Sequence, residues 1–139
     1  MTNLTAQESS EPMSCEHLVA RLTAQFEAAK TLEEIDEIQK IWDSSAFNKQ
    51  FIYSGKNEAA HFALSKEKWL RRFVLLNDFV NELLPQVEAA GNAEEAEAIW
   101  GRFRQSSLGK IWFNFDVIPS IYNTGLKLME AVNRKSRLG

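Results

Sequence analysis

The sequence predicts an all-α fold, a compact helical bundle of five or six helices built from a tandem repeat of about 61 residues. Apolar residues recur at helical spacing, capping residues precede acidic helix starts, and two stretches of the chain resemble each other. Only three prolines and six glycines occur in 139 residues, which is few for an all-β or loop-rich chain. We expect a single helical domain over residues 14–139, after a disordered polar tail at residues 1–13.

The internal repeat becomes visible when the chain is shifted by 61 residues, which aligns residues 18–52 with residues 79–113 without a gap. Eleven of these 35 aligned positions are identical, and several others keep their physical type. The two copies would occupy about residues 15–75 and 76–136. The alternative explanation is that any two acidic amphipathic helices resemble each other to some degree.

Both copies carry the same helix-start signal. Thr31 stands three positions before Glu34, and Asn92 stands three positions before Glu95. At this spacing the cap side chain can accept from the backbone amide of the glutamate, while the glutamate accepts from the amide of the cap. The pattern predicts that a new helix begins directly after each cap.

Two helices, at about residues 15–30 and 32–48, are predicted in the first copy. Their apolar stripes consist of Leu18, Leu22, Phe26 and Ala29 in the first, and of Ile35, Ile38, Trp42 and Ala46 in the second. Since only a very short junction separates them, we expect the two helices to fold back as an αα-hairpin.

The segment at residues 49–64 is ambiguous. It could be a loop followed by a short helix from Asn57, or a short β-hairpin that pairs residues 51–54 with residues 61–64. We favour the loop.

A long helix capped by Ser65 is predicted next, at about residues 65–84, where apolar residues step by three and four. Pro85 lacks an N–H and therefore predicts a kink or break. The remaining elements are a helix at about 93–107, an aromatic connector at 108–117 and a last helix at about 119–134.

Charge alternates along the chain. The net charge is −6 over residues 1–37, +4 over 38–72, −6 over 73–97 and +5 over 98–139, for a total of −3. Acidic helix starts and basic helix ends explain part of this pattern, because they complement the helix dipoles. The functional alternative is that the basic blocks form one surface for an anionic partner.

Arginines stand beside aromatic residues in the basic blocks. Phosphate binding by arginine and base stacking on aromatic rings are how single-stranded nucleic acids are bound without sequence preference. The candidates for such binding are Arg71, Arg72, Arg102, Arg104 and Lys110. Most of the neighbouring rings should nevertheless point into the core at this helical spacing.

Two tryptophans are candidates for a protein interface. Trp100 aligns with the polar Gln39 of the other copy, and Trp112 aligns with Phe51 in the ambiguous segment. An exposed tryptophan is a favourable interface anchor. The alternative is that the second copy has a wider apolar face.

No pattern of catalytic or metal-ligating residues is present. Only two histidines occur, and Cys15 and His17 are too close in sequence to share a face of a helix. Cys15 near a helix start could have a lowered pKa, but no partner motif supports a nucleophile. Phosphate-binding loops, zinc motifs and the hydrolase serine motif are absent from the sequence. We therefore expect no catalytic residue, no metal and no cofactor.

The sequence favours a non-enzymatic helical interaction protein, an accessory subunit, regulator or inhibitor that binds a larger protein or nucleoprotein assembly. The alternative is a small nucleic-acid-contacting subunit of a nucleoprotein effector complex that binds the phosphate backbone. No segment is apolar enough to span a membrane, and the N-terminus lacks the features of a secretory signal. A single cysteine is typical of a reducing compartment, so we expect a cytoplasmic location and no small-molecule substrate.

Overall fold

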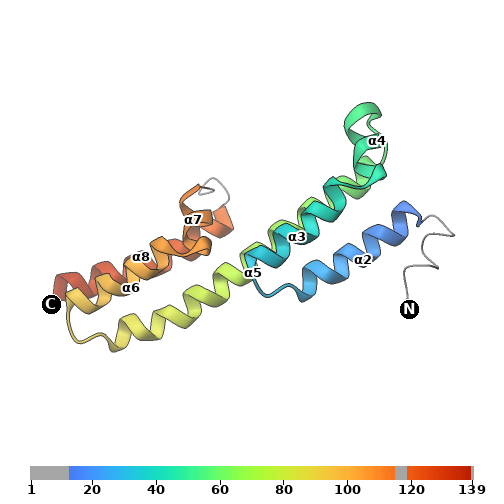
Figure 1. Cartoon of the computed structure of the whole chain (residues 1–139). Helices are drawn as coiled ribbons and strands as arrows, with labels where there is room; N and C mark the ends of the chain where they lie inside the picture. Colours follow the sequence, from blue (N-terminus) through green and yellow to red (C-terminus); the bar gives the residue numbers. More distant parts are fainter. Residues whose placement is uncertain (1–12, 115–118, 139) are drawn as a thin grey trace. The chain divides into compact units, whose positions relative to one another are not determined.

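A computed structural model describes residues 13–114 and 119–138 of the chain (Figure 1). Seven α-helices and no strand occur in these residues, which confirms the all-α prediction. The chain divides into two compact units, an N-terminal unit that ends at Arg71 and a C-terminal unit that begins at Arg72. The polar tail predicted at 1–13 lies outside the described residues, except for Met13.

The N-terminal unit contains α2 (Cys15–Ala28), α3 (Leu32–Asp43), α4 (Ala46–Ser54) and the first part of α5 (Glu58–Ala89). The turn between α2 and α3 is short, so these helices fold back on each other as the predicted αα-hairpin (Figure 1). The short helix α4 follows the end of α3 (Figure 1), and near the start of α5 His61 accepts a hydrogen bond from the indole N–H of Trp42 in α3.

The C-terminal unit contains the rest of α5, followed by α6 (Ala93–Gln105), α7 (Ser107–Asn114) and α8 (Pro119–Leu138). Helices α6 and α8 lie side by side over much of their length, and the short α7 connects to one end of this pair (Figure 1).

Each unit has an apolar core formed by one stripe from each helix. The core of the N-terminal unit contains Leu18, Leu22 and Phe26 from α2, Ile35, Ile38 and Trp42 from α3, and Leu64 from α5. The core of the C-terminal unit contains Leu76, Val80, Leu83 and Val87 from α5, Ala96, Ile99 and Phe103 from α6, Trp112 from α7, and Leu128, Ala131 and Val132 from α8. The predicted stripes of α2 and α3 are confirmed, apart from Ala46, which is exposed.

Both predicted helix caps are confirmed, with one change in their geometry. The amide of Glu34 donates to Thr31 Oγ1 at 3.1 Å, and the amide of Glu95 donates to Asn92 Oδ1 at 2.9 Å. The reciprocal bond to each glutamate comes from the amide of the residue before the cap, at 3.4 Å in the first case and 2.6 Å in the second. Each glutamate thus reaches one residue further back than the expected capping box.

The helix predicted at 32–48 is wrong in its extent, because it ends at Asp43 and a second helix starts at Ala46. Ser45 caps that second helix, with its Oγ accepting from the Asn48 amide at 3.1 Å. The buried Asn48 side chain donates through Nδ2 to the Asp43 carbonyl at 3.2 Å, which satisfies an otherwise unpaired group at the helix end.

The β-hairpin considered for residues 49–64 is not found, and the part expected to be a loop is helical up to Ser54, whereas the helix expected from Asn57 is found, since α5 begins at Glu58. A tight turn joins the two helices, with positive φ angles of 75° at Gly55 and 64° at Asn57. The Asn57 side chain stabilises this turn by donating to the Phe47 carbonyl at 3.1 Å. Helix α5 therefore starts at Glu58, and Ser65 lies inside it instead of capping it.

Helix α5 also continues through Pro85 to Ala89, so the break that we considered there is wrong. Pro85 is exposed and lies within the last five residues of the helix, where the backbone bond that it removes can be replaced by water. Most of the predicted connector at 108–117 is helical, because α7 extends to Asn114. Helices α4 and α7 raise the number of helices in the described part of the chain above the five or six expected.

Candidate interaction surfaces

Three large apolar side chains are exposed near the turn between α4 and α5. Ile52 and Tyr53 lie near the end of α4, and Phe62 lies in the second turn of α5. Their exposed fractions are 64%, 85% and 58%. We call Ile52, Tyr53 and Phe62 the corner patch.

The corner patch is supported by a layer of aromatic rings that connects it to the core. The rings of Phe51 and His61 stack with centroids 4.2 Å apart, and the ring of Phe62 meets that of Phe51 edge-on at 6.2 Å. His61 Nδ1 accepts from Nε1 of the buried Trp42 at 3.4 Å. The chain of contacts from Trp42 to Phe62 therefore places the Phe62 side of the patch on a packed platform.

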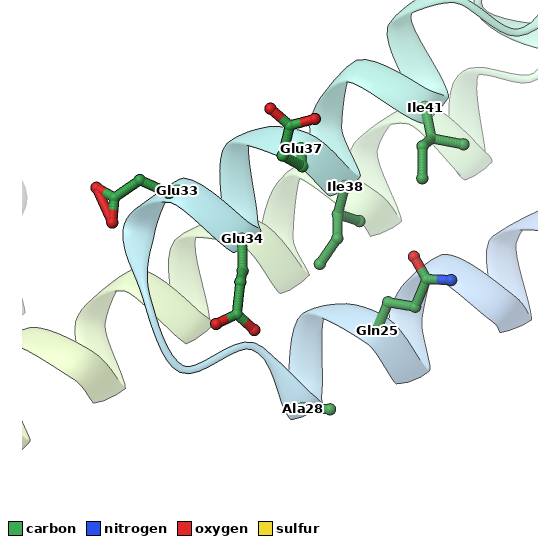
Figure 2. Close-up of a pocket in the computed structure, with 7 residues that line it drawn as sticks. All are labelled: Gln25, Ala28, Glu33, Glu34, Glu37, Ile38 and Ile41. Carbon is green, nitrogen blue, oxygen red and sulfur yellow. The ribbon is translucent and has the colours of Figure 1, made fainter.

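A groove between α2 and α3 forms a second surface of the N-terminal unit, with a volume of about 490 Å³. Its lining residues are Gln25 and Ala28 from α2, and Glu33, Glu34, Glu37, Ile38 and Ile41 from α3. Figure 2 shows Ile38 and Ile41 on the side of α3 that faces α2, with Gln25 directed toward them. We call this the acidic groove, because all three charged lining residues are glutamates.

The glutamates of the acidic groove differ in their partners. Glu34 is held by the helix cap, where it accepts from the Lys30 amide and from Thr31 Oγ1. Glu37 pairs with Lys40 at 3.1 Å, but both side chains are about 70% exposed, so this ion pair is weak. Figure 2 shows Glu33 and Glu37 directed away from α2, so the negative charge lies along the outer edge of the groove.

Cys15 lies beside a hollow lined mainly by alanines, where the start of α2 meets the start of α5. Burial, with a smaller contribution from the charge of Glu16, raises the pKa of the Cys15 thiol. The lowered pKa that a helix start can produce is therefore not found, and Cys15 has no feature of a reactive thiolate.

Trp112 is buried, with 6% of its surface exposed, and its indole packs closely against Gly125 of α8. Trp100 is half-buried and stacks on Phe103, with ring centroids 5.4 Å apart. It also meets Trp112 edge-on at 5.8 Å and lines a groove between α6 and α8. Of the two tryptophans, Trp100 thus retains a solvent-facing edge that could contact a partner.

The Trp100→Ala substitution should separate these two roles of the ring. Since Trp100 is half-buried, we expect a loss of about 1–3 kcal/mol in the free energy of unfolding, less than for a fully buried ring. Urea denaturation followed by circular dichroism measures this loss. A loss of about 3–5 kcal/mol would assign Trp100 to the core and would contradict a role at an interface.

The basic candidates in the C-terminal unit point toward different neighbours. Arg102 Nη2 donates to Gln86 Oε1 of α5 at 2.8 Å. Arg104 lines the groove between α6 and α8, on another side of α6. Lys110 is exposed on α7. The two arginines therefore do not form a single stripe along α6.

Arg71 is committed to a structural contact in the N-terminal unit. Its Nε donates to the Ala29 carbonyl at 2.7 Å, at the C-terminal end of α2. A positive side chain in this position also complements the helix dipole. Arg72 is half-buried as well, at the first position of the C-terminal unit.

Sequence reasoning missed the corner patch. The adjacent residues Ile52 and Tyr53 were assigned to a loop or hairpin, which left the face they occupy undefined. The Ser45 cap could have found Tyr53, since a helix drawn from Ser45 puts Asn48 and Phe51 on one face and turns Tyr53 away from it. Ile52 stands four positions after the buried Asn48, so helix spacing does not predict its exposure.

Within residues 13–114 and 119–138, no three histidine, cysteine, aspartate or glutamate side chains come close enough together to hold a metal ion. None of the described helices is both long and apolar enough to cross a membrane.

The chain was compared with known proteins at three levels. It matches no model of a protein family, no curated protein and no solved structure.

Proposed function

We propose that this chain is a non-enzymatic helical interaction protein that acts as an accessory subunit or regulator of a larger assembly. The observation that carries the proposal is the corner patch. Three large apolar side chains, each more than half exposed, occur on either side of one turn, and one of them, Phe62, packs against the rings of Phe51 and His61. Leaving such side chains in water forgoes about 1.5–3 kcal/mol of burial for each, and clustered exposure of this kind marks interaction sites.

We further propose that the two units are copies of one four-helix unit, as the sequence repeat predicts. Helices α3, α4 and α5 begin at residues 32, 46 and 58, while α6, α7 and α8 begin at residues 93, 107 and 119, each 61 positions later. The buried stripe of α3, Ile35, Ile38 and Trp42, corresponds at this offset to Ala96, Ile99 and Phe103 of α6, which are also buried.

The helix ends give the repeat separate support. Ser45 Oγ donates to the Trp42 carbonyl at 2.7 Å, and the corresponding Ser106 Oγ donates to the Phe103 carbonyl at 2.6 Å. A basic side chain also closes the end of the first helix of each unit at corresponding alanines. Arg71 donates to the Ala29 carbonyl, and Lys135 donates to the Ala90 carbonyl. Two unrelated amphipathic helices could resemble each other in sequence without sharing these contacts, so the contacts favour a true repeat.

The repeat also strengthens the argument about the corner patch. At the offset of 61, Tyr53 corresponds to Asn114 and Phe62 to Asn123. The second copy thus has a polar residue at two of the three positions, so the scaffold itself does not require apolar side chains there. A binding role supplies a reason for them in the first copy.

Nucleic-acid binding, the alternative function, has weaker support. Arg71 is occupied by a backbone carbonyl, and Arg102 and Arg104 point toward different neighbours. Fluorescence anisotropy with a labelled single-stranded oligonucleotide over a salt series tests the alternative. Binding that weakens steeply with salt would favour it, because displaced counterions accompany phosphate binding.

Photo-crosslinking in cells tests the proposed protein interaction. A benzoylphenylalanine at position 53 keeps an aromatic side chain in the corner patch, and we expect it to capture one defined protein identified by mass spectrometry. The matched control carries the same group in place of Glu88, an exposed residue of α5 in the C-terminal unit, and should not capture that protein.

Phe62→Ser supplies the second control. Since Phe62 is 58% exposed, we expect this change to lower the free energy of unfolding by less than about 1 kcal/mol and to abolish the crosslink from position 53. Equal capture from positions 53 and 88, or capture unaffected by Phe62→Ser, would contradict the role of the corner patch.

A further inference from the structure

The acidic groove of the N-terminal unit differs from the corresponding surface of the C-terminal unit in one decisive position. In the C-terminal unit, Arg102 of α6 reaches across to α5 and donates to Gln86 Oε1 at 2.8 Å. At the offset of 61, Gln86 corresponds to Gln25, but Arg102 corresponds to Ile41. This comparison rests on the proposed repeat.

The N-terminal unit therefore keeps the glutamine acceptor, as Gln25, and lacks an arginine at the position that corresponds to Arg102. Gln25 is half-buried and lines the acidic groove. Ile41 lines the same groove and is 39% exposed. Figure 2 shows Gln25 and the two isoleucines, Ile38 and Ile41, at the same opening between α2 and α3.

The charge at this opening defines what can occupy it. The lining residues include three glutamates and no basic residue, and Lys40 neutralises only Glu37. An acidic peptide or a phosphate group would be repelled, whereas an arginine or lysine would gain charge-assisted hydrogen bonds. The isoleucines add an apolar floor, which a purely polar ligand would leave in water.

We propose that the acidic groove binds a basic amphipathic helix of a partner protein. An arginine or lysine of that helix takes the place that Arg102 has in the C-terminal unit, beside Gln25 and the glutamate rim. Apolar side chains one turn away cover Ile38 and Ile41. This arrangement is the helix-in-groove mode of recognition, in which residues spaced by three and four serve as anchors.

The test uses the full chain and a fluorescein-labelled helical peptide of about 15 residues, with leucines at helical spacing and arginines between them. We expect fluorescence anisotropy to show binding that weakens as salt is added. The same peptide with every arginine replaced by glutamate should not bind.

Ile41→Arg is the decisive variant, because it would place an arginine beside Gln25, as Arg102 lies beside Gln86, and so block the groove from within. We expect it to weaken binding of the arginine peptide at least about tenfold, while the thermal unfolding midpoint changes little. Glu33→Lys, on the exposed rim, is the second variant and should weaken binding even if Ile41→Arg fails to fold.

Ile52→Arg makes the same chemical change on the corner patch and should leave peptide binding unchanged. Ile41→Arg should in turn leave the crosslink from position 53 intact, so failure of the groove proposal and failure of the proposed function give different results. Absence of binding at low salt, binding of the glutamate peptide, or equal binding by the wild type and the folded groove variants would overturn the proposal.

Discussion

The Trp42→Ala substitution is expected to lower the free energy of unfolding by about 3–5 kcal/mol, the largest stability effect of any single change considered for the N-terminal unit. Trp42 is 1% exposed and is among the largest fully buried side chains. Alanine would leave a cavity between the helices, since the surrounding chain relaxes only partly. It would also remove the indole N–H of Trp42, whose hydrogen bond to His61 Nδ1 helps to hold the His61 ring in place.

Urea denaturation followed by far-UV circular dichroism measures the effect. Trp42→Phe is the matched control, because it keeps most of the apolar volume and removes only the donor and part of the ring. We expect a smaller loss for it, of about 1–2 kcal/mol. If Trp42→Ala cost less than its phenylalanine counterpart, the packing described for α3 against α5 would be wrong.

The Gly125→Ala substitution is expected to reverse the usual effect of this exchange in a helix. In an open helical position, alanine is more stable than glycine by about 1 kcal/mol. A Cβ atom at Gly125, however, would overlap the indole ring of Trp112, which is itself buried and cannot move aside cheaply. Forcing an atom into a filled core costs about 1–3 kcal/mol, so we expect a net loss of stability.

Gly101→Ala provides the control with the opposite sign. Gly101 lies in α6, and a Cβ atom there would meet no other atom within 4 Å. We expect a gain of about 0.5–1 kcal/mol in the free energy of unfolding. The pair should thus move the thermal midpoint in opposite directions, and stabilisation by Gly125→Ala would show that Trp112 does not pack against α8.

Local signals were sufficient to predict the helix starts that depend on neighbouring residues. Thr31 and Asn92 bind the amide three positions later, and this spacing is visible in the sequence. The stripe of Leu18, Leu22 and Phe26 was also predictable, because a single helix face carries all of it.

The end of α3 was not predictable in the same way. Ser45 caps α4 without a glutamate three positions later, and its partner Asn48 is an unremarkable polar residue in the sequence. The start of α5 depends on Asn57, whose side chain binds the carbonyl of Phe47, ten residues earlier. A pattern search that compares neighbours three and four apart does not find such a contact.

The candidate sites show the same limit. Trp112 and Trp100 looked equally available in the sequence, yet Trp112 is buried because Gly125, on another helix, leaves room for its ring. The bond between Arg102 and Gln86 likewise joins two helices, so the sequence presented Arg102 only as part of a basic cluster.

Helix α5 has a consequence for how a gene for this chain can change. Domains joined by loops can be exchanged or lost at the loop, with little damage to either side. Here the boundary between Arg71 and Arg72 lies within a 32-residue helix. Separating the units at this point would create two new helix ends, one with unpaired carbonyls on the N-terminal unit and one with unpaired amides on the C-terminal unit. A cut between the two units therefore exposes more unpaired backbone groups than a cut in a surface loop would.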